Sequence, residues 1–439
     1  MQQTATRLRV DTTPPPVLPK KVRYILRGAR TSPTIIRWTF LLFVFTIPFE
    51  TITLESIPGA STLARLAGLL FFSFCFLYPK VCFRRPSQAL WWFAGYASVS
   101  VLSGFFIPEG SVGGLIADSQ TLVQLLVLCW LGSTLLQEEK LARHTLLIFS
   151  ISTLLTATGL ILGIPGFTEM RRERLSITGA DPNKFAVIMA LGAQALIGFG
   201  LEQIRRNIWM RMTFMAMSLL PLAAMVYTGS RGGILAFLAG VAFYALPYRS
   251  SKRKMAAILG VTIAVVGVVY IVVNDPNTLS RLEFSYQTGD TAGRDRLFTA
   301  AREMISEKPL LGWGPKVYLY ELGAREGKGY KLRGAHNLFL DLLLEGGFLG
   351  AMPFLIGFGL CVRAAWTARG CNLGLFQLVW LVTMTIAAMS CPWVGTKAMW
   401  LVLTLSLASG ASIVQQYKRK NLMIRTILQD IYKRNTSHQ

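Results

Sequence analysis

The residues best suited to chemistry lie in residues 331–350, where a basic loop turns into an apolar helix. His336 stands at that boundary. If the helix begins near Asn337, then Asn337, Asp341 and Glu345 recur every four residues and share one face of its first turns. A polar stripe is costly to expose to an apolar environment. The segment therefore predicts a functional site at the start of this helix.

His336 is the candidate for proton transfer. Of the three histidines, His144 falls at the opposite side of the predicted helices and His438 lies in the C-terminal tail. An imidazole titrates near neutral pH, and the neighbouring Asp341 and Glu345 favour a proton-transfer role. The alternative is that His336 only caps its helix or bonds to a loop carbonyl.

Arginines form a second group of candidates. Planar guanidinium groups suit phosphate oxygens, and a hydrogen bond to a charged group contributes about 1.5–3 kcal/mol. The alternative is that they pair with nearby carboxylates or contact lipid head groups. Arg231 differs from the others because its flanking glycines let the backbone approach a ligand closely. The candidates are Arg171, Arg172, Arg174, Arg231, Arg294 and Arg296, and their possible partners are Glu173, Asp181, Asp290 and Asp295.

The composition requires a membrane environment for these residues. Of the 439 residues, 52% are hydrophobic and 15% are charged, which is too apolar for a soluble chain of this length. We predict an all-α polytopic membrane protein with about twelve membrane-spanning helices of the usual length. The expected spans are 35–54, 60–79, 88–107, 113–136, 144–164, 184–203, 210–228, 232–248, 255–273, 337–362, 373–391 and 396–415.

The net charge of +23 lies mostly in short loops between these spans, so it indicates topology and not a nucleic-acid partner. The basic loops fall on the side of the N-terminus, which predicts that both termini are cytoplasmic. The expected divisions are a cytoplasmic tail (1–34), nine spans (35–273), a long outer loop (274–336), three spans (337–415) and a basic tail (416–439). A helix in that tail, with Ile424 on its apolar side, is expected to lie on the anionic inner leaflet.

The long outer loop is predicted to contain an amphipathic helix. Thr291 is the expected cap, and Leu297, Ala301, Met304 and Ile305 recur at the spacing of one apolar face. Pro309 and the turn Gly312-Trp-Gly-Pro are expected to end it.

No cofactor or metal site is predicted. The outer side lacks paired Asp-x-Asp, His-x-x-x-His or Cys-x-x-Cys spacings, and the six cysteines show no spacing typical of a metal site or disulfide framework. Arginines would then neutralise a phosphate without a divalent ion.

Several short motifs together resemble the O-antigen ligase and polymerase superfamily, over about residues 170–360. Their order and spacing make a chance resemblance improbable. The motifs are Arg174 to Asp181-Pro-Asn183, Thr228-Gly-Ser-Arg231-Gly-Gly, Gly293-Arg294, Lys308-Pro-Leu-Leu-Gly312-Trp-Gly314-Pro, His336-Asn337-Leu-Phe-Leu and Glu345-Gly-Gly-Phe-Leu-Gly350.

The resemblance implies a GT-C-like glycosyltransferase of the bacterial inner membrane, with its active site on the periplasmic face. Such an O-antigen ligase transfers O antigen from undecaprenyl diphosphate to the lipid A core in lipopolysaccharide biosynthesis. Carried over by motif, His336, Arg231 and Arg294 are the expected essential positions, together with Arg174. His336 and Asp341 are the catalytic candidates. Arg231, Arg294, Arg174 and Arg171 are expected to bind the donor diphosphate, and Asn337 and Arg333 to bind the acceptor or support the site.

The expected reaction is metal-independent and inverts the anomeric centre, with His336 taking the proton of the acceptor hydroxyl. Asp341 as the base, with His336 only binding the acceptor, is an open variant. An O-antigen polymerase shares the topology and is the first alternative; a lipid-linked oligosaccharide flippase or a noncatalytic scaffold are alternatives from other classes. The sequence leaves the sugars and the oligomeric state open.

Overall fold

A computed structural model describes residues 32–52, 62–103, 112–165, 168–171, 174–202, 207–245, 251–288, 293–327, 332–370, 373–414 and 424. Residues Ser32–Ile413 form one compact unit. The predicted N-terminal tail, except for its last residues, and nearly all of the predicted basic C-terminal helix lie outside the described residues.

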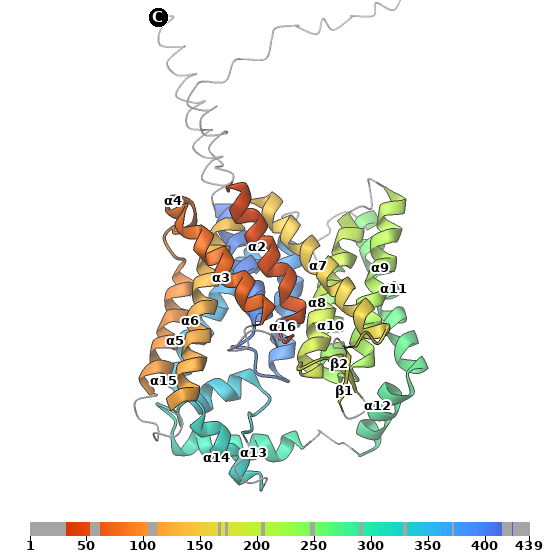
Figure 1. The fold of residues 1–439 in the computed structure, drawn as a ribbon. Helices are drawn as coiled ribbons and strands as arrows, with labels where there is room; N and C mark the ends of the chain where they lie inside the picture. Colours follow the sequence, from red (N-terminus) through yellow and green to blue (C-terminus); the bar gives the residue numbers. More distant parts are fainter. Residues whose placement is uncertain are drawn as a thin grey trace, which may run out of the picture. The chain divides into compact units, whose positions relative to one another are not determined.

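A helix occupies each of the twelve positions predicted from the sequence (Figure 1). Apolar runs between polar loops form helices because a backbone in lipid must satisfy its own hydrogen bonds. In chain order these helices are α2 (Thr34–Thr46), α3 (Leu63–Phe76), α5 (Gln88–Ser103), α6 (Val112–Leu135), α7 (Glu139–Ile161), α8 (Pro182–Glu202), α9 (Ile208–Tyr227), α10 (Arg231–Ala242), α11 (Ser251–Asn274), α15 (Leu338–Ala368), α16 (Gly374–Ala388) and the helix Lys397–Val414.

Within the described residues, six helices are long and apolar enough to cross a membrane: α6, α7, α8, α9, α15 and Lys397–Val414. Four apolar helices are shorter, namely Thr34–Phe49, Leu63–Phe76, Arg231–Ala245 and Gly374–Ala388. The protein is therefore a multispanning helical membrane protein, and the number twelve stays a prediction.

Helix α8 forms the centre of the bundle, because 94% of its 18-residue apolar stretch is buried inside the protein. Polar groups attach it to its neighbours. The Gln194 side chain donates to the Phe237 carbonyl at 3.1 Å, and Tyr244 and Trp380 donate to α8 carbonyls at 2.8 and 2.9 Å. Side-chain hydrogen bonds of this kind join helices in a membrane, where apolar burial gives little preference for one partner over another.

The fold is nearly all helical, as predicted, with one hairpin that the sequence did not indicate. Strands β1 (Thr168–Arg171) and β2 (Arg174–Ile177) form an antiparallel hairpin before α8, with Met170 opposite Leu175. Two four-residue strands are too short to give a periodic pattern in the sequence.

The predicted outer loop contains three helices and not one. Helix α12 (Pro276–Thr288) follows α11 at an angle of 93°, and α13 (Arg294–Glu307) and α14 (Val317–Arg325) come next. All three lie with the hairpin at one end of the bundle, and the short α4 (Pro79–Cys82) lies at the other (Figure 1). We call α13, α14 and residues 332–337 the cap.

The cap has its own small hydrophobic core. The predicted apolar face of α13 is confirmed, since Leu297, Ala301 and Met304 are buried and Ile305 packs beside them. Helix α13 begins after Gly293. Thr291, the predicted N-cap residue of this helix, lies outside the described residues. The buried members of this core are Leu297, Ala300, Ala301, Met304, Tyr318, Leu322, Ala335 and Leu344.

Helix α15 is broken at Gly347, where φ is 58° and ψ is −161°. The expected span 337–362 contained no such break. The first part of α15 packs into the cap core through Leu344, and its second part packs against α5, with the rings of Phe354 and Phe93 5.4 Å apart.

Candidate functional site

A cavity of about 430 Å³ is lined by residues of the cap helix α13 and of elements in the bundle. Its wall includes four arginines from four different elements, and three of them are sequence candidates. The lining residues are Arg174, Asn183, Gly229, Arg231, Gly232, Arg281, Arg294, Asp295, Phe298 and Met389.

Arg231 is the first residue of α10. The Ser230 hydroxyl caps this helix by accepting from the Gly233 amide at 3.2 Å. Gly229 precedes it with φ +60°, and a side chain there would meet Arg281 at 3.5 Å. This distance is an ordinary van der Waals contact, so the positive φ and not crowding is what favours glycine in this turn.

Arg174 reaches the cavity from β2. Its Nε donates to the Thr228 carbonyl at 2.7 Å, and its Nη2 donates to Asn183 Oδ1 at 2.8 Å. The Ser230 hydroxyl donates to the same Asn183 oxygen at 3.0 Å. The hairpin, α8 and the turn before α10 are therefore joined at one wall of the cavity.

Arg294 is the first residue of α13, and its Nη2 donates to the Ser390 carbonyl at 3.4 Å. Ser390 follows α16, so this contact joins the cap to the bundle. Phe298, one turn further along α13, also lines the cavity.

Arg281 is a lining residue that sequence reasoning missed. It projects from α12, which is held against α9 by a hydrogen bond of 3.0 Å from the Thr278 hydroxyl to the Val226 carbonyl. No glycine flanks Arg281, so no close-approach motif marked it. The available signal was its position in an amphipathic segment of the long outer loop.

The cavity is suited to an anion for two reasons. Asn183, Arg231 and Arg294 lie in the first turns of α8, α10 and α13, and a helix N-terminus carries about half a positive charge. The four arginines face one acidic residue, Asp295, among the lining residues that the structure describes. Burial lowers the pKa of Arg174 to about 10, and Arg281 and Arg231 lower it as well.

His336 lies just before α15, near enough to Arg294 for their charges to interact, and it is not among the described residues that line the cavity. Its backbone is left-handed, with φ 53°. Burial lowers its pKa, and so do Arg333 and Arg294, while Asp181 and Glu326 oppose them. The ring is therefore largely neutral at neutral pH, which a general base requires.

The neighbours of His336 fix its backbone. The Asn337 side chain caps α15 by accepting from the Phe339 amide at 3.0 Å, so the capping role considered for His336 belongs to Asn337. Asp341 Oδ1 accepts from the Ala335 amide at 2.8 Å. This contact fixes the backbone of the residue that precedes His336.

The remaining candidates occupy other places. Arg333 pairs with Glu326 at 2.8 Å, and its amide donates to the Leu319 carbonyl at 3.0 Å, which ties the His336 segment to α14. Glu345 is turned away from the cap and accepts from the Ser100 hydroxyl at 2.6 Å. Arg171 is in β1, and its side chain lies outside the described part of the structure.

Comparison with known proteins agrees with the geometry. A family model described as O-antigen ligase matches residues 216–355, a range that contains Arg231, Arg281, Arg294 and His336. An O-antigen ligase of Pseudomonas aeruginosa PAO1 is 24% identical over 296 residues, which cover 66% of this chain and 68% of that protein. Both similarities support the resemblance of this chain to the O-antigen ligase and polymerase superfamily.

Proposed function

We propose that this protein is an O-antigen ligase of the bacterial inner membrane, with the cavity on the periplasmic face. It would transfer O-antigen polysaccharide from undecaprenyl diphosphate to a sugar hydroxyl of the lipid A core. The observation that carries the proposal is the cavity whose wall joins Arg174, Arg231, Arg281 and Arg294. A diphosphate matches this wall in charge and in hydrogen-bonding geometry.

In the proposed reaction, the arginines hold the donor diphosphate and stabilise the charge that grows on it as the sugar is released. The acceptor hydroxyl oxygen forms a bond to the anomeric carbon, and the bond from that carbon to the phosphate oxygen breaks. Undecaprenyl diphosphate leaves with the electron pair. The hydroxyl proton passes to His336, and direct displacement inverts the anomeric centre.

His336→Asn is the sharpest test of the base. Asparagine is among the residues that tolerate a left-handed backbone, so the variant retains the local fold and loses only the basic nitrogen. Loss of a general base costs about 10²–10⁴-fold in rate. We expect transfer by purified protein to fall by that factor, in buffer containing EDTA, while the melting temperature stays unchanged.

The same reconstitution separates the alternatives. A ligase needs the lipid A core and yields a covalent product with it, a polymerase lengthens the lipid-linked glycan with donor alone, and a flippase gives no covalent product. Wild-type rates in His336→Asn would remove His336 from the chemistry and leave Asp341 as the candidate base. Activity that EDTA abolishes and magnesium restores would overturn the metal-independent reaction.

A further inference from the structure

The break in α15 is bridged by the loop that follows α13. In a continuous helix the amide of Phe348 would bond to the carbonyl of Leu344, and that of Leu349 to Glu345. Here the amides of Phe348 and Leu349 donate to the carbonyls of Pro309 and Leu310, at 2.8 and 3.0 Å.

The two carbonyls left free by the break are satisfied by the same loop. Leu344 accepts from the Trp313 amide at 2.7 Å, and Glu345 accepts from the Gly314 amide at 2.8 Å. Two helical hydrogen bonds are thus replaced by four bonds to residues 309–314. We call this arrangement the splice.

The splice brings two backbones into direct contact. A Cβ at Gly347 would lie 2.4 Å from the Leu310 carbonyl carbon, and one at Gly312 would lie 2.6 Å from the Gly347 nitrogen. Both glycines have positive φ, 58° and 67°. No other residue fits either position without moving the loop off the helix.

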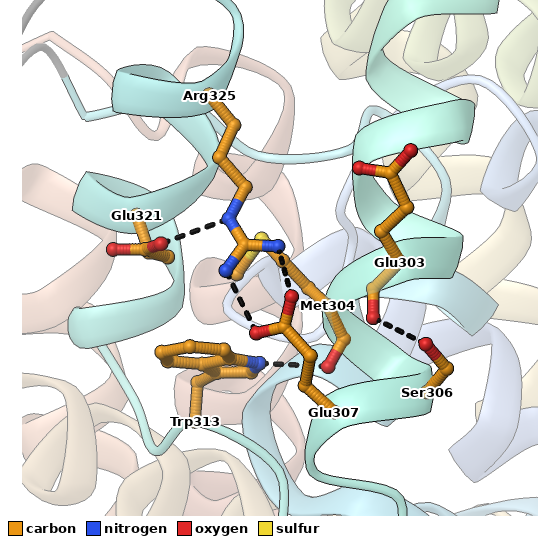
Figure 2. A network of polar contacts seen from close by, with 7 residues as sticks. All are labelled: Glu303, Met304, Ser306, Glu307, Trp313, Glu321 and Arg325. Carbon is orange, nitrogen blue, oxygen red and sulfur yellow. Dashed lines mark hydrogen bonds and ion pairs between the residues drawn. The ribbon is translucent and has the colours of Figure 1, made fainter.

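The loop is held in place from the cap side by Trp313 and Arg325 (Figure 2). The Trp313 indole donates to the Met304 carbonyl at 2.8 Å. Arg325 binds both oxygens of Glu307, at 2.7 and 2.8 Å, and its guanidinium lies 5.3 Å from the Trp313 ring centre. A bidentate pair with a fixed fork geometry restrains the loop more than a single ion pair would.

The splice joins the two halves of the candidate active site. On one side, α13 carries Arg294 into the cavity. On the other side, the first part of α15 carries Asn337 and Asp341, which fix the backbone around His336. The second part of α15 packs on α5 in the bundle. Arg231 belongs to the bundle as well, as the first residue of α10.

We infer that Gly312, Trp313, Arg325 and Gly347 are positioning residues that set the place of His336 relative to the arginine cavity. This inference rests on the proposed ligase function. A displacement of about 1 Å in a reacting group can cost about 10²-fold in rate. Three of the four cavity arginines lie outside the cap, so opening the splice affects the chemical step more than donor binding.

The test compares two adjacent glycines. Gly347→Ala should lower kcat for transfer by about 10²-fold, with a much smaller rise in donor KM. Gly346→Ala is the matched control, because a Cβ there meets only a Val99 methyl at an ordinary 3.9 Å. Equal kcat losses in both variants, or a wild-type kcat in Gly347→Ala, would overturn the inference.

A distance measurement tests the splice without activity. Spin labels at Glu303→Cys in α13 and Met210→Cys in α9 report the position of the cap relative to the bundle. Both positions are exposed, and α9 extends about 25 Å from Met210 to its end near the cavity. Cys371→Ser serves as background, because the other five cysteines are buried. Gly347→Ala should broaden or shift the distance distribution and Gly346→Ala should not; an unchanged distribution in Gly347→Ala would overturn the inference.

Arg325→Ala gives a second variant if Gly347→Ala does not fold. It removes the pair with Glu307 at the protein surface and should lower kcat by about tenfold. Arg302→Ala is its control, since Arg302 is exposed on α13 and its Nε donates only to the Phe298 carbonyl one turn away, at 3.2 Å. Equal rates in the two variants would argue against the inference.

If the wild-type protein transfers no glycan, the ligase function is wrong, and the distance distributions alone decide whether the splice fixes the cap.

Discussion

Like charges gathered in one buried wall raise the free energy of the empty site. The pKa of Arg174 falls to about 10 because of burial and because of Arg281 and Arg231. A base whose pKa falls on folding is less stable in its charged form in the folded protein. The charge of Arg174 therefore lowers the stability of the fold at every pH below about 10. Arg174 still carries its charge at neutral pH. A bound dianion would turn that repulsion into attraction.

Arg281→Gln tests the arginine that the sequence did not mark. Loss of one charged hydrogen bond to phosphate costs about 1.5–3 kcal/mol, which is about 10–100-fold in donor affinity. We expect donor KM to rise by that factor while the melting temperature is unchanged or higher, because repulsion on Arg174 is removed. Arg302→Gln serves as the charge-matched control. An unchanged donor KM would exclude Arg281 from the diphosphate site.

The pH dependence of transfer tests His336. Its pKa lies below the ordinary value of about 6.5, so the neutral base is lost only when pH falls through that lower value. The acidic limb of kcat/KM should therefore lie below pH 6.5. Arg333→Gln removes a positive charge and frees Glu326, and both changes raise the pKa of His336. The limb should then move to higher pH; a limb that stays in place would show that another group titrates.

At the scale of residues, the sequence could identify groups whose local context carries the signal. Arg231 was singled out by its flanking glycines and Arg294 by the Gly293-Arg294 motif, and both line the cavity together with Arg174. Arg281 has no such context, and only the fold of α12 against α9 brings it there. The contact of Asp341 with the Ala335 amide could not be predicted, because it depends on the exact backbone path before α15.

At the scale of elements, the position of Arg231 depends on how closely α10 approaches α8 and α16. A Cβ at Gly240 would lie 2.5 Å from the Gln194 amide nitrogen and 3.0 Å from the Val379 carbonyl oxygen. Gly240→Ala forces these helices apart, at a cost of about 1–3 kcal/mol, and moves the N-terminus of α10. We expect a lower melting temperature together with weaker donor binding.

Gly267→Ala in α11 is the control for this substitution. Its Cβ would meet one Leu219 methyl at an ordinary 3.5 Å. The control should keep both the melting temperature and the donor KM of the wild type. If Gly240→Ala behaves like the control, the packing of α10 does not position Arg231.

The positions of the long helices could be predicted from the sequence, whereas the break in α15 and the short helices could not. Long apolar runs specified the helices, because backbone bonding in lipid leaves no other choice. The break in α15 was missed because Gly346-Gly347 inside an apolar run resembles an ordinary close-packed helix. Only the non-local bonds of residues 309–314 make Gly347 a break. The separate helices α12 and α14 were missed because short segments carry weak periodicity.

At the scale of the whole molecule, the residues that could do chemistry gather at one end of a largely apolar bundle. The bundle core and the cap core are separate clusters of buried side chains. The splice, the ion pair of Lys316 with Asp118 at 2.8 Å and the hydrogen bond from Arg294 to the Ser390 carbonyl all join the cap to the bundle. An anion that binds Arg294 together with Arg231 would therefore hold the cap to the bundle.

This linkage predicts that inorganic pyrophosphate stabilises the whole protein. A ligand that binds only the folded state adds about 2.7 kcal/mol at about 100 times its Kd. The melting temperature of the detergent-solubilised protein should rise with pyrophosphate, and less with sulfate at equal ionic strength, because one tetrahedral anion reaches fewer arginines. Screening by salt should weaken the effect.

The matched variant is Arg231→Gln/Arg294→Gln, which leaves the bundle core intact and removes one cation from each side of the cavity. Its melting temperature should not respond to pyrophosphate. An equal shift in the wild type and the variant would mean that the anion binds elsewhere, for example at the basic loops of the opposite end. A shift confined to the wild type would identify the arginine cavity as the place where a diphosphate couples the cap to the bundle.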